Sequence, residues 1–434
     1  MRAILDLIQR HKAGAPVGLY SVCSAHPVVL AAALQVGQEC STPVLVEATS
    51  NQVNQYGGYT GMRPADFRRY VAGLAREAGF PEQRLLLGGD HLGPNCWQSE
   101  PAEAAMAKAE AMVADYVRAG FRKIHLDCSM ACADDPVTLD DATVAARAAR
   151  LCAAAEAAHA ESGGEAPVYV VGTEVPVPGG AHEALDTLAV TTPGAAAGTL
   201  AAHQLAFTRR GLGAAWERVV GLVVQPGVEF DHHKVIDYAP DKARELSRFI
   251  DGQRSIVYEA HSTDYQTPAA LKALVEDHFA IIKVGPGATY ALRETLWSLA
   301  EIEDLCVRQG RSQLKHVVLE TMQRHPQHWQ RYYHDAGQLQ LDLQFSLSDR
   351  IRYYWAHPQV QKACAALLHN LSQGPLPLTL LSQHLPHQYA AIRGGRLDNS
   401  IPHILRDGVA RVLRHYARAS QPAAWTTHKG EPLQ

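Results

Sequence analysis

The chain has 434 residues, of which 47% are hydrophobic and 19% are charged, and its formal net charge is −4. This length suits one large domain with an extension, and the apolar content supports a sizeable core. A chain with this charge lacks the positive field that nucleic acids and anionic membranes require, so we expect neither as a partner. No apolar run approaches the roughly 20 residues that span a bilayer.

Residues 1–16 have the pattern of an amphipathic helix and lack the apolar segment and cleavage site of a signal peptide. The chain holds eight cysteines and no CxxC pair, which is typical of reduced cysteines in a cytosolic enzyme. We therefore expect a cytoplasmic protein. Cys128 and Cys132 have the spacing of one helical face, but we do not expect them to bind zinc.

Short, β-branched apolar runs recur along the chain, each followed by an Ala-rich helical stretch. Because these runs are continuous rather than alternating, they predict strands buried on both faces, hence a parallel sheet. Eight such strands with crossover helices predict a (β/α)8 TIM barrel of the α/β class. An open doubly wound sheet is the alternative, but no GxGxxG turn follows the first run. The predicted strands are residues 17–25, 42–50, 84–92, 123–129, 168–176, 218–227, 255–262 and 280–287.

The intervening segments fit helices. Residues 64–79 carry a proline near the start and a glycine at the end, as helices commonly do. Residues 101–119 and 139–160 are Ala-rich, with apolar residues spaced three and four apart. These segments are the expected outer helices of the barrel.

The alternation of strand and helix stops after the eighth predicted strand. Helical patterns follow around residues 314–333, 348–372 and 402–418. We therefore expect a barrel over residues 1–313 and a helical extension, residues 314–434, packed against it. Three aromatic residues of the second pattern are interpreted as core or interface anchors rather than a ligand site, and they make a homo-oligomer plausible: Tyr353, Tyr354 and Trp355.

Polar and ionisable residues stand where nearly every predicted strand ends. In a parallel barrel all C-terminal ends face the same way, so these side chains converge on the mouth where barrel enzymes keep their active sites. Burying so many carboxylates and imidazoles without a counter-charge would cost several kcal/mol each. A bound divalent cation accounts for the pattern. The residues are Ser24, His26, Glu47, Ser50, Asn51, Gln52, Asp90, His91, His125, Asp127, Ser129, Glu174, Gln225, Glu229, Glu259, His261, Ser262, Thr263 and Lys283.

His91 and His261 are the best candidates for metal ligands, and Glu174 is the best carboxylate partner. Neutral imidazoles and carboxylates suit Zn²⁺ in particular, or Mn²⁺, and such sites keep a position open for substrate. The alternative is that both histidines are hydrogen-bonded structural residues.

Asp90, adjacent to a candidate ligand, is the expected acid–base residue for a substrate hydroxyl or C–H proton. Asp127 or Gln225 would complete the metal site, either as a ligand or behind one. Asp127 and Glu174 join Asp90 in the predicted catalytic set. Substrate contacts are expected from Glu47, Asn51 and Gln225.

The loops after the last two predicted strands, residues 261–264 and 285–287, are small and rich in backbone donors. In barrels these loops frequently hold a phosphate. Lys283 would add a charge there, or alternatively close an ion pair inside the barrel. No GxxxxGK[ST] motif occurs, so we do not expect an ATP-dependent kinase. The predicted phosphate contacts are Ser262, Thr263, Lys283, Gly285 and Gly287.

Long motifs throughout the chain resemble the Z subunit family of tagatose-1,6-bisphosphate aldolase, the GatZ/KbaZ-like proteins. The resemblance runs across essentially the whole chain, helical tail included. The motifs are VCSAHP, VEATSNQVNQYGGYTGM, GGDHLGPNCW, KIHLDCSM, GTEVPVPGGAHE, VVQPGVEFDH, EAHSTDYQTP, KVGPG, SDRIRYYW and PLPLTLLSQHLPHQY.

The family is in turn similar to class II, metal-dependent ketose-bisphosphate aldolases. There a catalytic Asp precedes a zinc-binding His at a strand end, which Asp90-His91 resembles, and another zinc-binding His precedes a phosphate-holding turn, as His261 does. One departure is that the remaining zinc histidine is replaced by Gln225. An amide is a poorer ligand, so we expect a carboxylate to be drawn in. Further matching positions are Asp127, Glu174, Gly179, Gly180, Glu183 and Ser262.

The resemblance implies two functions. One is a non-catalytic partner that stabilises a class II aldolase subunit in tagatose and galactitol breakdown. The other is metal-dependent 4-epimerisation of ketohexoses or their 6-phosphates. A third label used in the family is tagatose-6-phosphate kinase, which we do not expect because the sequence has no nucleotide-binding motif. The predicted ring of carboxylates and imidazoles favours the enzyme. We therefore expect an isomerase that interconverts tagatose 6-phosphate and fructose 6-phosphate by retro-aldol chemistry, with Asp90 moving the C4 hydroxyl proton.

Overall fold

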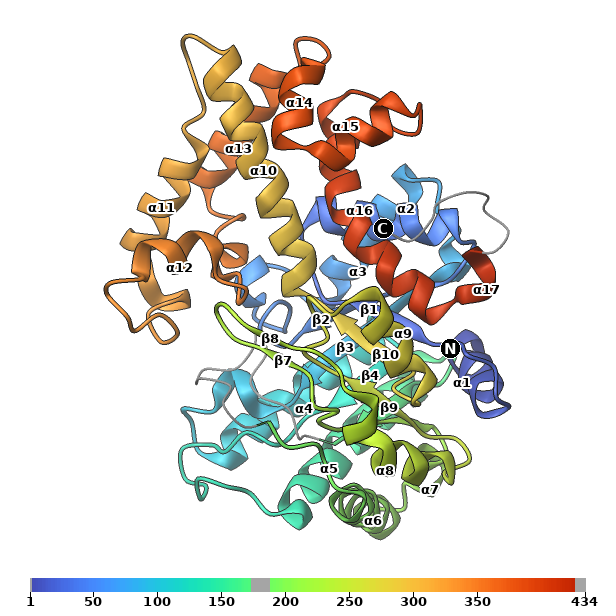
Figure 1. Cartoon of the computed structure of the whole chain (residues 1–434). Helices are drawn as coiled ribbons and strands as arrows, with labels where there is room; N and C mark the ends of the chain where they lie inside the picture. Colours follow the sequence, from blue (N-terminus) through green and yellow to red (C-terminus); the bar gives the residue numbers. More distant parts are fainter. Residues whose placement is uncertain (1, 173–187, 426–434) are drawn as a thin grey trace.

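The computed structural model describes residues 2–172 and 188–425 (Figure 1). Eight parallel strands close into a barrel in the order β1-β10-β9-β6-β5-β4-β3-β2. This confirms the predicted (β/α)8 fold, and each predicted strand range contains one observed strand. The barrel strands are β1 (Leu19–Val22), β2 (Val44–Thr49), β3 (Leu85–Leu92), β4 (Lys123–Leu126), β5 (Val168–Val171), β6 (Val219–Val223), β9 (Val257–Ala260) and β10 (Ile281–Val284).

Helices surround the barrel, and several of them start with proline, whose missing N–H is not needed in a first helical turn. A short antiparallel hairpin, β7 (Glu229–Phe230) with β8 (Val235–Ile236), follows β6. The helices up to the end of the barrel are α1 (Arg2–Lys12), α2 (Pro27–Glu39), α3 (Pro64–Glu77), α4 (Ala102–Arg118), α5 (Asp141–Ser162), α6 (Pro193–Arg209), α7 (Gly213–Trp216), α8 (Pro240–Asp251), α9 (Pro268–Glu276) and α10 (Pro286–Cys306). Three 3₁₀ turns lie among them: η1 (Gly58–Thr60), η2 (Glu82–Arg84) and η3 (Pro94–Trp97).

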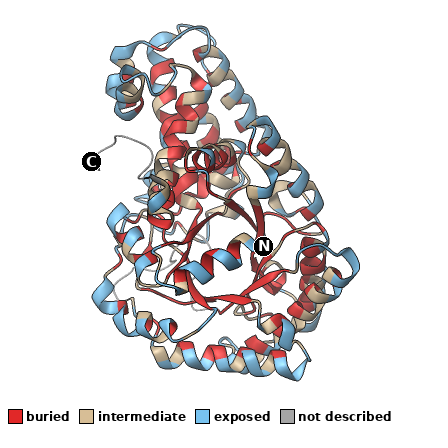
Figure 2. Cartoon of the chain, turned by 90° about the vertical axis from the view of Figure 1, so that its right-hand side faces the viewer, coloured by how far each residue is buried: buried red, intermediate tan, exposed pale blue. Residues whose placement is uncertain are grey.

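The first helix closes the N-terminal end of the barrel, and Figure 2 shows it lying across the ring of strands. Its apolar face, Ile4, Leu7 and Ile8, packs on the inward side chains at the start of the strands, such as Leu45 and Val257. This burial removes water from that end and is the main driving force for docking an amphipathic helix there. Any site inside the barrel must therefore open at the opposite end.

The helical extension is broken more often than its sequence pattern predicts. The pattern over 314–333 ends as an α-helix at Arg324, and the pattern over 348–372 divides at Pro358, because proline supplies no N–H to an interior helical turn. The third pattern is confirmed as α16. The elements are α11 (Leu314–Arg324), η4 (Pro326–His328), α12 (Leu339–Phe345), η5 (Arg350–Tyr353), α13 (Pro358–Leu371), α14 (Leu378–His384), α15 (Pro386–Arg393), α16 (Ile401–Ser420) and α17 (Pro422–Trp425).

The extension shares a hydrophobic core with the barrel helices, to which Leu296 of α10, Leu367 of α13 and Val409 of α16 all contribute. In Figure 1 α16 runs back alongside α2. The extension therefore packs on the barrel, as expected. The boundary between two domains at residue 313 stays a prediction. Tyr354 and Trp355 are buried in this core as predicted.

No helix in the two described ranges is long and apolar enough to cross a membrane. All eight cysteines lie in these ranges and are free, and Cys128 and Cys132 are buried.

Candidate metal and active site

The barrel interior is layered along its axis. Apolar side chains fill the end covered by α1. Further along the strands, Glu47 and Glu259 form ion pairs with Lys123 and Lys283. Imidazoles and Asp90 follow at the C-terminal end of the strands. The polar strand ends of the sequence thus meet at one mouth, as the parallel topology requires.

The ion-pair layer consists of buried charges that satisfy one another. Lys123 Nζ lies 2.7 Å from Glu47 Oε1 and 2.6 Å from Glu259 Oε2. Lys283 Nζ lies 2.5 Å from Glu47 Oε2 and 2.6 Å from Asp90 Oδ1. Burial lowers the pKa of Lys283, but the carboxylates of Asp90, Glu259 and Glu47 outweigh it and hold that pKa well above its usual value. Lys283 thus forms an ion pair inside the barrel, which was the alternative prediction for it. Its contact with Asp90 also places its ammonium group at the candidate site.

Asp90 and His91 both face the site although they are consecutive, whereas neighbours in a regular strand point to opposite faces. The backbone resolves this conflict at His91, whose φ of 48° is left-handed, and the β3–β4 register shifts between Gly89 and Leu92. Such an irregularity re-aims a side chain at some conformational cost, which is typical of functional sites. The carbonyl of Asp127 also approaches so closely that a Cβ on Gly93 would lie 1.6 Å from it, so only glycine fits there.

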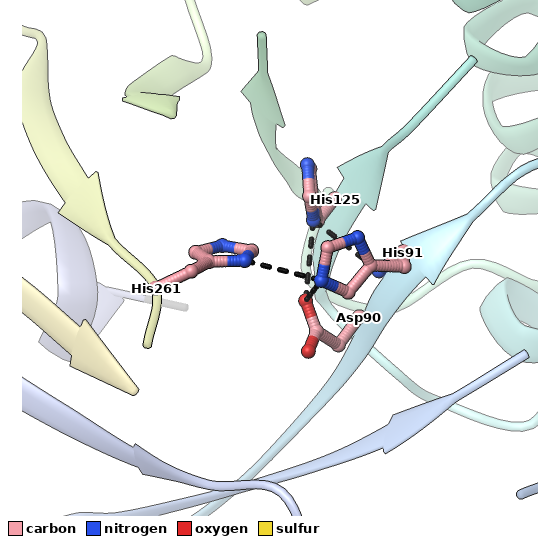
Figure 3. Close-up of side chains that lie close together, drawn as sticks. All are labelled: Asp90, His91, His125 and His261. Atoms are coloured by element: carbon pink, nitrogen blue, oxygen red, sulfur yellow. Dashed lines mark hydrogen bonds and ion pairs between the residues drawn. The ribbon is translucent and has the colours of Figure 1, made fainter. Parts of the chain in front are cut away.

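His91 and His261 face each other across the mouth, with His91 Nε2 3.1 Å from His261 Nδ1 (Figure 3). Each ring is anchored on its far side by a carboxylate. Nδ1 of His91 lies 2.7 Å from Asp127 Oδ2, and Nε2 of His261 lies 2.9 Å from Glu259 Oε1. These carboxylates accept the ring N–H, so in the neutral rings the two facing nitrogens carry lone pairs.

His125 provides a third imidazole. Its Nε2 lies 3.4 Å from the Gly172 carbonyl, and its Nδ1 lies 3.2 Å from both the backbone nitrogen of His91 and Asp90 Oδ1. With Nε2 donating to Gly172, the single lone pair of Nδ1 would be available either to the His91 N–H or to a cation beside Asp90. The sequence reasoning noted His125 at a strand end but gave it no role. The signal was the alternation of Lys123, His125 and Asp127, which places all three on the inner face of β4.

These donors fit a divalent cation. Ligand atoms of Asp90, His91, His125 and His261 all lie within 4.8 Å of one another, and all four residues are buried. Facing lone pairs repel unless a proton or a cation lies between them. Carboxylates behind metal-ligating imidazoles are also the usual way in which proteins orient such ligands. The cluster thus offers a ligand set suited to Zn²⁺ or a similar ion.

The electrostatics favour the same conclusion. Glu47, Asp90, Asp127 and Glu259 are four carboxylates, and they meet two ammonium groups, Lys123 and Lys283, within the buried network. With neutral imidazoles two negative charges remain. Burial lowers the pKa of His261 to about 3, whereas the carboxylates of Asp90 and Asp127 overcome the effect of burial and raise the pKa of His91. A proton on His91 or a cation between the two rings would therefore offset part of this negative charge.

Asp90 is ionised in this setting. Burial raises the pKa of its carboxyl group, but Lys283, His91 and His125 outweigh burial and hold that pKa well below its usual value. The thiol of Cys23 approaches Asp90 Oδ2 at 3.5 Å. Asp127 is likewise kept ionised, because hydrogen bonds from His91 and Ser129 overcome its burial and lower its pKa.

The structure gives Gln225 a different place from the one expected of it. Its side-chain oxygen accepts the backbone N–H groups of Gly227 and Val228 at 2.8 and 3.0 Å, so the amide holds a turn. His125, not Gln225, contributes beside the two predicted histidines. Glu174, Gly179, Gly180 and Glu183 lie outside the described residues.

The expected phosphate loops are also arranged differently. The N–H groups of Gly285 and Gly287 both donate to Asp264 Oδ1, at 2.9 and 2.7 Å, so a carboxylate already fills this position at the start of α10. Thr263 is fully buried and donates to the Lys283 carbonyl. Of the predicted phosphate contacts, Ser262, Lys283 and Gly285 line the cavity described next.

A cavity of about 440 Å³ opens from the imidazoles toward the helical extension. This volume falls in the range of small-molecule sites, roughly 300–1,000 Å³. Asn51 lines it as expected, whereas Glu47 is enclosed beneath in the ion-pair layer. Tyr353, expected as a core or interface anchor, packs against the core and also lines the cavity. The lining residues from the barrel and hairpin include Cys23, Asn51, Tyr59, Asp90, His91, Phe230, His261, Ser262, Asp264 and Lys283, and those from the extension are Gln327, His328, Gln330, Arg331, Tyr332, Arg350, Arg352 and Tyr353.

Fold and site together define a (β/α)8 barrel with a cavity and a buried cluster that could hold a cation at its C-terminal mouth. The family profile described as D-tagatose-1,6-bisphosphate aldolase subunit GatZ/KbaZ-like matches residues 4–421. The chain therefore belongs to the GatZ/KbaZ-like family, as its motifs predict.

Three solved structures resemble this chain to different degrees, and the first of them has the same fold. A probable tagatose 6-phosphate kinase from Sinorhizobium meliloti 1021 is 48% identical, with a TM-score of 0.86 over 93% of this chain and 100% of that chain. A fructose-bisphosphate aldolase (Fba) from Campylobacter jejuni is 12% identical, with a TM-score of 0.47 over 84% of this chain and 91% of that chain. The YdjI aldolase from Escherichia coli K12 is 11% identical, with a TM-score of 0.43 over 83% of this chain and 94% of that chain.

Proposed function

We propose that this protein is a metal-dependent 4-epimerase that interconverts D-tagatose 6-phosphate and D-fructose 6-phosphate. The observation that carries the proposal is the convergence of His91, His125 and His261 beside Asp90 in one cavity. Three neutral imidazoles with a position left open for substrate are typical of catalytic rather than structural zinc sites. Membership of a family described by an aldolase of ketohexose phosphates supports this substrate class.

In the proposed site the three histidines would hold the cation and Asp90 acts as the base. A divalent cation there would polarise the C2 carbonyl of the ketose and stabilise negative charge that develops on its oxygen. Asp127 and Glu259 keep the imidazoles of His91 and His261 in the required tautomer and orientation. Lys283 Nζ lies 2.6 Å from Asp90 Oδ1 and holds the carboxylate in place, and Asp90 Oδ2 lies 3.5 Å from the Cys23 thiol.

The reaction follows from the chemistry at C4. Asp90 accepts the C4 hydroxyl proton, the C3–C4 bond breaks, and its electron pair moves toward C3 and the C2 carbonyl, so that an aldehyde fragment leaves. The aldehyde turns its other face to C3, the bond re-forms, and Asp90 returns the proton to the new C4 oxygen. Direct removal of the C4 hydrogen is less suitable, because that hydrogen is not α to the carbonyl. Both fragments must be retained during the turn, and the walls from the extension supply this enclosure.

Family membership also supports a second candidate, a subunit that stabilises a class II D-tagatose-1,6-bisphosphate aldolase. An accessory subunit would use its outer surface and has no need of a buried imidazole cluster. The cluster favours the enzyme for that reason.

Glu174 remains a proposed ligand or catalytic residue, and Glu174→Gln tests it.

The test is to incubate the purified chain with Zn²⁺ or Mn²⁺ and fructose 6-phosphate and to follow tagatose 6-phosphate by NMR or chromatography. Asp90→Asn and His261→Ala should abolish conversion, whereas His316→Ala, which removes an exposed histidine, should not. Full activity in either site variant would refute the assignment. No conversion, together with a raised melting temperature of a class II aldolase on mixing, would favour the subunit; ATP-dependent phosphorylation of tagatose 6-phosphate would favour a kinase.

A further inference from the structure

The cavity reaches basic residues that the metal site does not use. The turn η5, Arg350–Tyr353, lies in the helical extension, yet three of its residues line the same cavity as His91. Figure 1 shows the extension, from α11 to α14, standing to one side of the barrel and reaching its mouth near α12. The sequence interpretation treated this segment as packing.

Arg350 is a buried cation with unused hydrogen-bonding capacity. Its side chain is only 5% exposed, and its Nε donates to the His328 carbonyl at 2.7 Å. Its Nη1 is buried without a hydrogen-bond partner. The guanidinium lies over the rings of Tyr332 and Tyr353, at 3.5 and 4.8 Å from their centroids, which holds it in place without neutralising it. A buried donor left unpaired is costly, so its presence beside a cavity indicates a ligand.

Arg352 adds a second charge whose partners are also uncharged. It donates to the backbone carbonyls of Ser348 and Asp349 and, at 3.1 Å, to the Tyr353 hydroxyl. The Asp349 carboxylate is itself engaged by Thr289, at 2.5 Å, and Arg352 also lies close enough to Asp264 to lower the pKa of that carboxyl group. The lining of the cavity still carries more positive than negative charge, with four cations, Lys283, Arg331, Arg350 and Arg352, and two carboxylates, Asp90 and Asp264.

We propose that Arg350 and Arg352 form the subsite for the phosphate group of the ketohexose phosphate. This proposal rests on the proposed function and extends it. Arginine is the residue best suited to phosphate, because its planar set of donors pairs with two phosphate oxygens. The backbone donors of Gly285 and Gly287, where barrels often bind phosphate, already donate to Asp264. The helical extension thus binds the phosphorylated end of the substrate, and the barrel acts on the carbonyl end.

The experiment measures binding rather than turnover. Isothermal titration calorimetry of the full-length chain, treated with EDTA, compares inorganic phosphate, fructose 6-phosphate and fructose as ligands. Arg350→Gln and Arg352→Gln should weaken the two phosphate ligands at least tenfold and leave fructose unchanged. Arg350→Lys, which keeps the charge but not the paired donors, should fall between. Arg324→Gln is the matched control, because Arg324 is an exposed arginine paired with Glu320.

Circular dichroism and thermal unfolding first check that each variant is folded, because Arg350 also donates to the His328 carbonyl. If Arg350→Gln is unfolded, the comparison is made with Arg350→Lys instead. Equal affinity for phosphate ligands in wild type and both glutamine variants, or an equal loss for fructose, would overturn the subsite. Arginine-dependent binding of fructose 6-phosphate without epimerisation would preserve the subsite and refute the proposed reaction. If the variants epimerise fructose 6-phosphate with an unchanged KM, the proposed reaction stands and the arginine subsite is refuted.

Discussion

His91 Nε2 and His261 Nδ1 lie 3.1 Å apart, although the two residues are separated by 170 positions along the chain. Each ring has its other nitrogen against a carboxylate, so the facing atoms are acceptors when the rings are neutral. This contact gives the mouth of the barrel two facing nitrogen atoms that could hold a cation.

The contact predicts a metal-dependent melting temperature. Adding Zn²⁺ or Mn²⁺ to the EDTA-treated chain should raise its melting temperature, because a ligand that binds only the folded state stabilises it, by about 2.7 kcal/mol at 100 times its Kd. Differential scanning fluorimetry measures the shift. His91→Ala and His261→Ala should eliminate it, and His316→Ala should retain it. A shift that survives in both site variants would place the metal elsewhere.

His125 and Gln225 should separate in their effects. His125→Ala removes an imidazole from the cluster and should weaken zinc binding by at least tenfold, as lost first ligands do. Gln225→Ala should leave zinc affinity within about threefold and instead lower the unfolding free energy by about 1–3 kcal/mol, since it leaves two backbone N–H groups at a turn without their acceptor. Competition with a chromogenic chelator and urea unfolding measure the two quantities. The opposite pattern would restore Gln225 as the ligand.

Lys283→Met should destabilise the fold strongly. The substitution keeps the apolar length of the side chain but leaves Glu47, Glu259 and Asp90 with one buried ammonium group fewer, and breaking a buried pair costs about 3–5 kcal/mol. Urea unfolding at neutral pH measures the loss. Lys272→Met, at a lysine whose side chain is 64% exposed, should change stability by less than about 0.5 kcal/mol. Similar values for the two variants would show that the network contributes little.

Asp264→Asn should remove a pH-dependent loss of stability. Burial raises the pKa of Asp264 from 3.8 to about 6 in the folded chain, so its contribution is fully present below the unfolded value and is lost as the pH rises through about 6. Asparagine keeps an acceptor for Gly285 and Gly287 and has no charge to bury. The variant should therefore gain, relative to wild type, on the order of 3 kcal/mol between pH 4 and pH 7, less whatever its unpaired NH₂ costs.

Urea unfolding across that pH range gives the comparison. Asp241→Asn, at an exposed aspartate, should follow the wild-type curve. If the two curves for wild type and Asp264→Asn stay parallel, the Asp264 carboxyl group does not titrate in the expected range.

Residue patterns along the chain are sufficient to predict the fold and the end of the barrel at which the candidate site lies. Eight continuous apolar runs predict buried parallel strands, and parallel strands bring their polar ends to one mouth whatever the loops between them do. His91, His261 and Asp90 could be predicted as site residues for that reason, because they stand at strand ends and all strands of a parallel barrel point the same way. The family followed from motifs that extend over the whole chain.

Which donor atoms meet at that mouth follows from the packing of the whole chain. The inner position of both Asp90 and His91 depends on a left-handed residue that breaks the alternation of β3, and strand periodicity does not reveal such a break. Gln225 and Asp264 bind backbone N–H groups of neighbouring turns, which no spacing of residue types encodes. Arg350 reaches the cavity through the packing of a distant helical extension on the barrel. Local patterns fix which face a side chain takes, but contacts between remote segments are selected by the packing of the whole chain.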